Sequence, residues 1–116
     1  KEVKINDKDT GFDLYLKSEK LGYDLIKDNL YKIANDNIKT YKQKNVLDNS
    51  NKIEKTYKSS EIEDLKRINF NELNSENALR KIRAFDSPYH EPAFTYIRDE
   101  KIYLRYKYNG YDKNEN

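Results

Sequence analysis

The chain has 116 residues, of which 38% are charged and 35% are hydrophobic, so we expect one small domain whose thin core relies on a partner surface. The 23 basic and 21 acidic residues leave a net charge of +2, which argues against a nucleic-acid interface. The lack of cysteine excludes disulfides and thiolate metal sites, and no run is apolar enough for a membrane span or a signal peptide, so we expect a cytoplasmic protein.

The first predicted element is a short strand. Residues 1–7 alternate charged and apolar side chains, with Val3 and Ile5 on one face. The stretch from Asp7 to Gly11 is acidic, but it lacks the alternating ligands and the terminal Glu of a calcium loop. Helix capping explains this stretch better, because Thr10 and Asp13 have capping-box spacing and Asp9 could cap equally well.

A long helix is predicted from Phe12 to Ala34. Its apolar residues fall close to one stripe, which comprises Leu14, Leu21, Leu25, Ile26, Leu30 and Ile33. Gly22 inside the helix predicts close packing against a neighbour or a break between two shorter helices. The stripe has few facing residues elsewhere in the chain, so we expect marginal stability for the isolated polypeptide.

Residues 35–58 are rich in Asn and Lys and lack a clean periodicity. We interpret them as a linker or an irregular excursion. The alternative is a pair of weak strands around Val46 and Ile53.

Two short helices are predicted next. The first begins at a capping box formed by Ser60 and Glu63. The second has its start signal at Asn74 or Ser75. Its apolar stripe comprises Ala78, Leu79, Ile82 and Phe85.

Both prolines of the chain follow the second helix. Pro88 ends the helical region, and Pro92 repeats the constraint, so the residues between them must take an extended or turn path. A hairpin is expected after this turn. Phe94, Tyr96 and Ile97 precede a polar turn at residues 98–101. In the second strand, one face carries Ile102, Leu104 and Tyr106, and the other face carries Tyr103, Arg105 and Lys107.

His90 is the only histidine and the obvious candidate for acid–base chemistry. Its neighbours Asp86 and Glu91 are close in sequence, but such close neighbours do not normally point at each other, so we favour a loop histidine that faces solvent or is hydrogen-bonded. Contact with a ligand is the alternative. No metal site is expected, because carboxylates alone would have to supply its ligands.

Basic and aromatic side chains give two further candidates. Arg80 and Arg83 could clamp a phosphate, although most arginines on helix surfaces are solvated or paired with acids. The hairpin tyrosines could stack on a base, although such residues more often form a half-buried sheet face or a subunit contact.

Two stretches resemble the formyltransferase family, which includes methionyl-tRNA formyltransferase and the sugar-nucleotide N-formyltransferases. "INDKDTGFDLYLKSEKLGYDLI" is similar to the last strand and helix of the family's catalytic domain. "IRAFDSPYHEPAFTYIRDEKIYL" is similar to the segment that enters its C-terminal region. "YKSSEIEDLKRINFNE", between them, resembles the connector of the sugar-modifying branch.

The resemblance implies an α+β chain divided into four parts. Residues 1–38 would be the last strand and helix of the catalytic domain, and residues 39–58 a linker. Residues 59–107 would be the C-terminal helices and hairpin, and residues 108–116 a disordered tail. The family's catalytic Asn, "His-Pro-Ser" segment and acidic "Asp-x-Gly" loop are not found in the chain, so it is expected to lack a catalytic residue and to be inactive alone.

In the intact enzyme, the resemblance implies formyl transfer from N10-formyltetrahydrofolate to an amino-sugar nucleotide, with no cofactor bound by this chain alone. Arg83, Tyr89 and His90 are the expected substrate-binding residues. The expected partner is an upstream catalytic domain or a second subunit. From Phe94 onward only 23 residues remain, whereas the five-stranded barrel of the tRNA enzyme needs on the order of 50. A methionyl-tRNA formyltransferase-like fragment and a non-enzymatic protein-interaction module are the alternatives.

Overall fold

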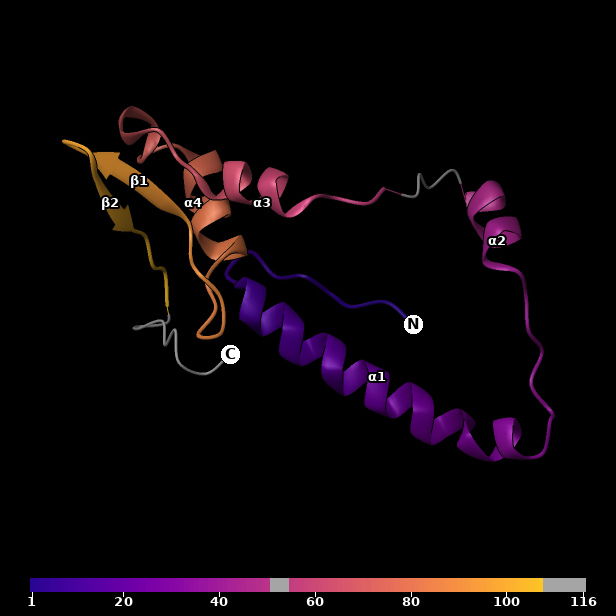
Figure 1. Cartoon of the computed structure of the whole chain (residues 1–116). Coiled ribbons are helices and arrows are strands. Elements are labelled where there is room, and N and C mark those ends of the chain that lie inside the picture. Colours follow the sequence, from indigo (N-terminus) through magenta and orange to yellow (C-terminus); the bar gives the residue numbers. More distant parts are fainter. Residues whose placement is uncertain (51–54, 108–116) are drawn as a thin grey trace.

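The computed structural model describes residues 1–50 and 55–107 (Figure 1). In the described part, five helices precede a two-stranded antiparallel sheet, so the architecture is α+β. The elements are α1 (Gly11–Ala34), α2 (Gln43–Ser50), α3 (Ser59–Lys66), the 3₁₀ helix η1 (Phe70–Glu72), α4 (Glu76–Ala84), β1 (Phe94–Ile97) and β2 (Glu100–Tyr103).

The chain is elongated. Its radius of gyration is 18.7 Å, whereas a compact domain of this length has about 13 Å. In Figure 1, α3, α4 and the hairpin gather at the N-terminal end of α1, and the rest of α1 projects away from them. None of the described helices is both long and apolar enough to cross a membrane.

The predicted cap of α1 is confirmed. The Thr10 hydroxyl accepts a hydrogen bond from the backbone N–H of Asp13 at 3.1 Å, and the Asp13 carboxylate accepts one from the backbone N–H of Thr10 at 3.0 Å. Such a cap contributes about 1 kcal/mol to helix stability. Asp9, the other candidate, instead accepts hydrogen bonds from the backbone N–H of Asn6 and from the Lys17 ammonium.

The predicted strand around Val3 and Ile5 is wrong for this chain. Residues 1–6 have no regular secondary structure and run along α1 as an arm, which we call the N-terminal arm. Lys1 pairs with Asp28 at 2.8 Å, and Lys17 donates to the carbonyl oxygen of Lys4 at 3.2 Å. A strand needs a neighbouring strand to pair its backbone, and the described sheet contains only β1 and β2.

Gly22 does not mark a close contact or a break. α1 is continuous, and a methyl group placed on Gly22 would meet nothing within 4 Å. The surroundings of Gly11 differ, because a methyl group there would overlap the carbonyl oxygen of Ala84. The close approach in α1 is therefore at its first residue, where it crosses the end of α4.

The segment from 39 to 58 is not wholly irregular, since it contains α2. Val46 lies in this helix, so the alternative of a strand there is wrong. A two-turn helix satisfies its own backbone hydrogen bonds, whereas a strand at Val46 would lack a partner. Ile53 and the predicted tail at 108–116 lie outside the described residues.

The two short helices are confirmed, with one correction. α3 begins before the predicted capping box: Lys58 is the N-cap residue, and the Glu61 carboxylate accepts from the backbone N–H of Lys58 at 2.6 Å. Glu61 therefore takes the place expected for Glu63. In α4, Ser75 is the cap, as predicted, and its hydroxyl accepts from the backbone N–H of Ala78 at 3.1 Å.

The core lies between α4, η1 and the hairpin. Ile68, Ala78, Ile82 and Ala93 are buried, and Leu73, Phe85 and Leu104 pack around them. The predicted stripe of α4 supplies three members of this cluster, whereas Leu79 remains 45% exposed. Burying an aliphatic side chain contributes about 1.5–3 kcal/mol, so this small cluster is the main apolar contribution to stability.

The hairpin is confirmed, with a tighter turn and an earlier second strand than predicted, because β2 is Glu100–Tyr103 and Leu104 and Tyr106 lie after it. Phe94 faces Tyr103 and Ile97 faces Glu100, which leaves Arg98 and Asp99 as the two turn residues. Their φ angles of 48° and 65° are those of a type I′ turn, whose twist matches that of the strands. The far edge of β1 is also paired, because the N–H of Ile68 donates to the carbonyl oxygen of Phe94 at 2.9 Å.

Asp86 joins three parts of the chain. Its carbonyl oxygen accepts from the N–H of Phe12 at 3.2 Å, at the start of α1. Its buried carboxylate accepts from the backbone N–H of Lys107 at 2.7 Å and lies 3.6 Å from the guanidinium of Arg105. Asp86 alone thus connects the end of α4, the beginning of α1 and the segment after β2.

The two glycines of α1 predict opposite effects of the same substitution. Gly11→Ala should destabilise the chain by about 1–3 kcal/mol, because the new methyl group overpacks the contact with Ala84. Gly22→Ala should stabilise it by about 0.5–1 kcal/mol, because the site is open and alanine favours a helix. Urea unfolding of both variants tests this pair. Equal shifts in the same direction would contradict the packing of α1 on α4.

Candidate binding groove

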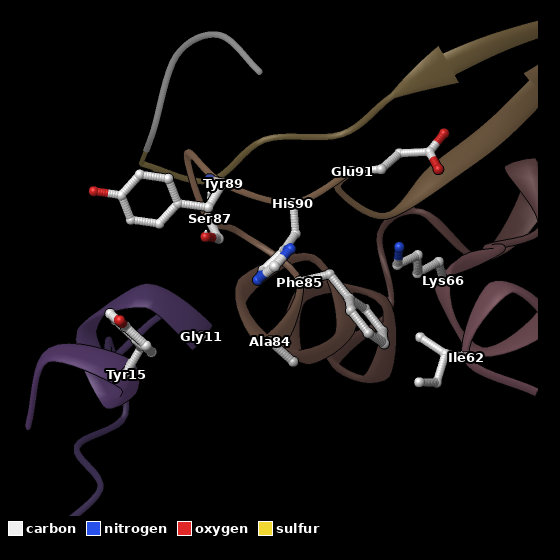
Figure 2. Close-up of a pocket in the computed structure, with 10 residues that line it drawn as sticks. All are labelled: Gly11, Tyr15, Ile62, Lys66, Ala84, Phe85, Ser87, Tyr89, His90 and Glu91. Carbon is white, nitrogen blue, oxygen red and sulfur yellow. Dashed lines mark hydrogen bonds between the residues drawn. The ribbon is translucent and has the colours of Figure 1, made fainter. Parts of the chain in front are cut away.

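An open groove of about 820 Å³ lies where α1, α3 and α4 meet the turn that holds both prolines (Figure 2). This volume falls within the range of about 300–1,000 Å³ that is usual for small-molecule sites. The lining residues are Gly11, Tyr15, Ile62, Lys66, Ala84, Phe85, Ser87, Tyr89, His90 and Glu91.

The first wall of the groove depends on the start of α1. Gly11 lets this helix approach Ala84 closely, and the Phe12 ring packs edge-on against Tyr89 with centroids 5.2 Å apart. Phe12 also stacks on Tyr15 at 6.1 Å. The two tyrosines therefore stand on a common aromatic base, and Figure 2 shows both at the same end of the groove.

The turn between the prolines is held from inside. Pro92 is fully buried, and the hydroxyl of Ser87 accepts from the N–H of Tyr89 at 3.2 Å. The carbonyl oxygen of Ser87 accepts from the guanidinium of Arg105 at 2.8 Å. These contacts fix the backbone that carries Tyr89 and His90, and proline further limits its freedom.

His90 is exposed, as the favoured interpretation expected, and it also lines the groove. Figure 2 shows its ring between the tyrosine end and the end formed by Ile62 and Lys66. A general base needs a group that fixes its tautomer. The nearest acid in sequence, Glu91, is engaged elsewhere, so this arrangement favours ligand contact over proton transfer.

Glu91 belongs to an ion-pair network at the base of the hairpin. Its carboxylate accepts from the Lys101 ammonium and from the Tyr103 hydroxyl, both at 2.7 Å. Lys101 also donates to Glu63 at 3.3 Å and lies 4.0 Å from the centroid of the Phe94 ring. The network links the hairpin to α3, the helix that forms the far end of the groove.

The network shifts the pKa values of both partners. The hydrogen bonds from Lys101 and then Tyr103 hold the pKa of the Glu91 carboxyl below its ordinary value of 4.5. The hydrogen bond to Glu91 is the largest cause that raises the pKa of the Lys101 ammonium. Both groups are therefore charged at neutral pH, and the groove gains little net charge from them.

The structure does not bring the two candidate arginines together with the groove. The Arg83 guanidinium lies over the Tyr106 ring at 5.9 Å, and Arg83 is absent from the lining. Arg80 pairs with Glu76 one helical turn away at 2.6 Å on the exposed face of α4. A phosphate clamp made by both arginines is not formed in the described residues.

Of the residues that line the groove, only Tyr89 and His90 were predicted to bind substrate. Tyr15 and Ile62 were treated only as members of helices, and Lys66 was not singled out. Their capping and periodicity signals place them on α1 and α3 but do not say that these helices meet. Phe85 was predicted as a core residue, and it does pack against the core while also lining the groove.

The aromatic lining and the single lysine suit a planar ligand that carries a polar or anionic group. Within residues 1–50 and 55–107, no group of three or more His, Asp or Glu side chains is placed to hold a metal ion. No protein-family model matches the chain, and neither the curated proteins nor the solved structures contain a significant match. The resemblance to formyltransferases therefore rests on the quoted motifs.

The Glu91 network predicts a pH-dependent contribution to stability. Because folding lowers the pKa of Glu91, its contribution is complete above the ordinary value of 4.5 and is lost as the pH falls through the lower folded value. Glu91→Gln should cost about 1 kcal/mol at pH 7, and this difference should shrink as the pH falls below 4.5. Urea unfolding across pH measures it.

Glu100→Gln is the matched control, because Glu100 lies on the same hairpin and is exposed. It should change stability by less than about 0.5 kcal/mol at any pH. A cost for Glu91→Gln that stayed constant down to pH 3 would show that Glu91 contributes by packing and not by charge.

Proposed function

We propose that this chain is the C-terminal part of a formyltransferase that acts on an amino-sugar nucleotide. The intact enzyme would transfer the formyl group of N10-formyltetrahydrofolate to the sugar amine. The chain supplies the end of the catalytic domain, the substrate-edge groove and the hairpin. The catalytic centre and the folate site belong to the upstream catalytic domain.

The observation that carries this proposal is an extended arm followed by a long helix that covers no sheet in the described part of the chain. The N-terminal arm runs beside α1, with Ile5 68% exposed and Val3 half-buried. Leu14 and Leu21 are half-buried on the helix. A strand followed by a helix packed beside it is the repeating unit of doubly wound α/β domains. The motif with this resemblance has the order of that unit, with the irregular N-terminal arm in the place of the strand.

The groove and hairpin support the sugar-nucleotide branch. The described C-terminal part contains one hairpin, and the net charge of +2 offers little attraction for tRNA. Formyl transfer requires a base for the amine and donors for the tetrahedral oxyanion. With Glu91 engaged by Lys101, the groove offers binding contacts, and Tyr89 and His90 would hold the substrate at its rim.

The first test is the coding sequence upstream of Lys1. We expect an open frame that encodes an Asn, a "His-Pro-Ser" segment and an acidic "Asp-x-Gly" loop. The product of the whole frame should transfer the formyl group to an amino-sugar nucleotide and not to methionyl-tRNA. A start codon at or just before Lys1, or activity on methionyl-tRNA alone, would overturn the proposal.

The second test uses the whole enzyme and two variants of the groove. Tyr89→Ala and His90→Ala should each raise the KM for the sugar nucleotide about tenfold, which is the loss of one aromatic or polar contact of about 1.4 kcal/mol. The kcat should change less than about threefold, because neither side chain takes part in the chemistry. Tyr41→Ala is the control, since Tyr41 is exposed and does not line the groove.

The rival function is a protein-interaction module. The two faces of the hairpin favour it, because Tyr96 and Tyr103 on one face and Ile97 and Ile102 on the other are each about 40% exposed. Such residues are typical of contact surfaces. An upstream frame without the catalytic signatures would favour this function.

A further inference from the structure

The single stripe predicted for α1 is wrong, because Leu30 lies about 180° from Leu21 around the helix axis. Leu14 and Leu21 are half-buried on one side. A second apolar stripe, which the proposed function does not use, lies on the other side. Leu16, Tyr23 and Leu30 are 45%, 66% and 59% exposed. Residues of an α-helix are about 100° apart, so the second stripe lies about 200° from the first, on the opposite side of the helix. We call it the far stripe.

The spacing of the far stripe is that of a helix packing against another helix. Its three members recur every seven residues, and Ile26 and Ile33 follow Tyr23 and Leu30 by three. Spacings that alternate between three and four form the seam of a coiled coil. This spacing keeps the apolar side chains on one side of the helix, where a partner helix can pack against them.

The exposed area is most of what a specific contact needs. Leu16, Tyr23, Ile26, Leu30 and Ile33 together expose on the order of 600 Å², and a standard interface buries about 800 Å² on each partner. Figure 1 shows the C-terminal half of α1 well away from α3, α4 and the hairpin, so a second helix has room to approach it.

We infer that a second copy of this chain covers the far stripe, with the two α1 helices antiparallel. Leu16 and Leu30 lie seven residues before and after Tyr23, so a two-fold rotation at Tyr23 places Leu16 against Leu30 of the second copy. The same rotation brings Glu19 to the level of Lys27 of the second copy, since these residues lie four before and four after Tyr23. A parallel pair would instead set Glu19 level with its own counterpart.

The antiparallel arrangement also keeps the larger ends apart. The hairpin and the short helices gather at the N-terminal end of α1 (Figure 1). Two antiparallel helices place these ends at opposite extremes of the dimer. The dimer does not use the side of α1 that carries Leu14 and Leu21. The inference therefore stands independently of the proposed function.

Sedimentation across a concentration series tests the contact. The chain should approach twice its monomer mass of 13.9 kDa. Tyr23→Gln combined with Leu30→Gln should weaken the dimer at least about tenfold. Tyr31→Gln is the matched control, because Tyr31 is 80% exposed on the same helix but lies off the far stripe, and it should leave the dimer unchanged. A monomer at every concentration, or a dimer that tolerates the double variant, would overturn the inference.

Cross-linking tests the orientation and does not depend on the stability of the glutamine variants. The chain has no cysteine, so introduced thiols are the only ones present. Tyr23→Cys should form a disulfide-linked dimer under oxidation, and a mixture of Leu16→Cys and Leu30→Cys chains should join 16 to 30. Efficient cross-linking of Leu16→Cys to itself would show a parallel pair and overturn the antiparallel arrangement.

Discussion

The position of Asp86 constrains every other part of the folded unit. Its backbone and side chain contact the start of α1 and the segment after β2, while the residue itself comes directly after Phe85, the cap residue of α4. A fully buried carboxylate is stable only when charge and hydrogen bonds compensate for lost water. Arg105 and the N–H of Lys107 supply that compensation, so the chain must bring its last described residues back to the end of α4. The groove exists because this closure sets α1 beside the proline turn.

The proline turn, whose position Asp86 fixes, forms part of the binding surface. Asp86 and Ser87 are both buried and both contact Arg105, so the backbone that follows them has little freedom. Tyr89 and His90 then leave the turn on the side where Gly11 admits α1. The core itself is small, and it would not hold α1 without these polar ties. Polar contacts therefore take over part of the role that apolar packing has in larger domains.

The elements with local signals were predictable from the sequence, whereas the contacts between them were not. Thr10, Ser75 and the alternation after Phe94 each act within a few residues, and the structure has all three as expected. The strand around Val3 failed because pairing depends on a partner that no local pattern reveals. The prediction of close packing at Gly22 was wrong because a glycine alone does not show whether a neighbour approaches it. Only the fold distinguishes Gly22 from Gly11. The groove joins residues from four segments, so Tyr89 and His90 could be named while Tyr15 and Lys66 could not.

Because α1 is long, a small change in its tilt at the N-terminal end displaces its C-terminal end by a larger distance. Twenty-four residues form a rod of about 36 Å, and Gly11 and Phe12 at its first turn contact the end of α4 and the proline turn. A tilt of about 10° at that anchor would displace the opposite tip by roughly 6 Å, which exceeds the width of a side chain. A ligand in the groove beside Gly11 therefore lies close to the point about which α1 would tilt. A small change in the tilt of α1 at this point would produce a large displacement of any molecule bound to the C-terminal half of the helix.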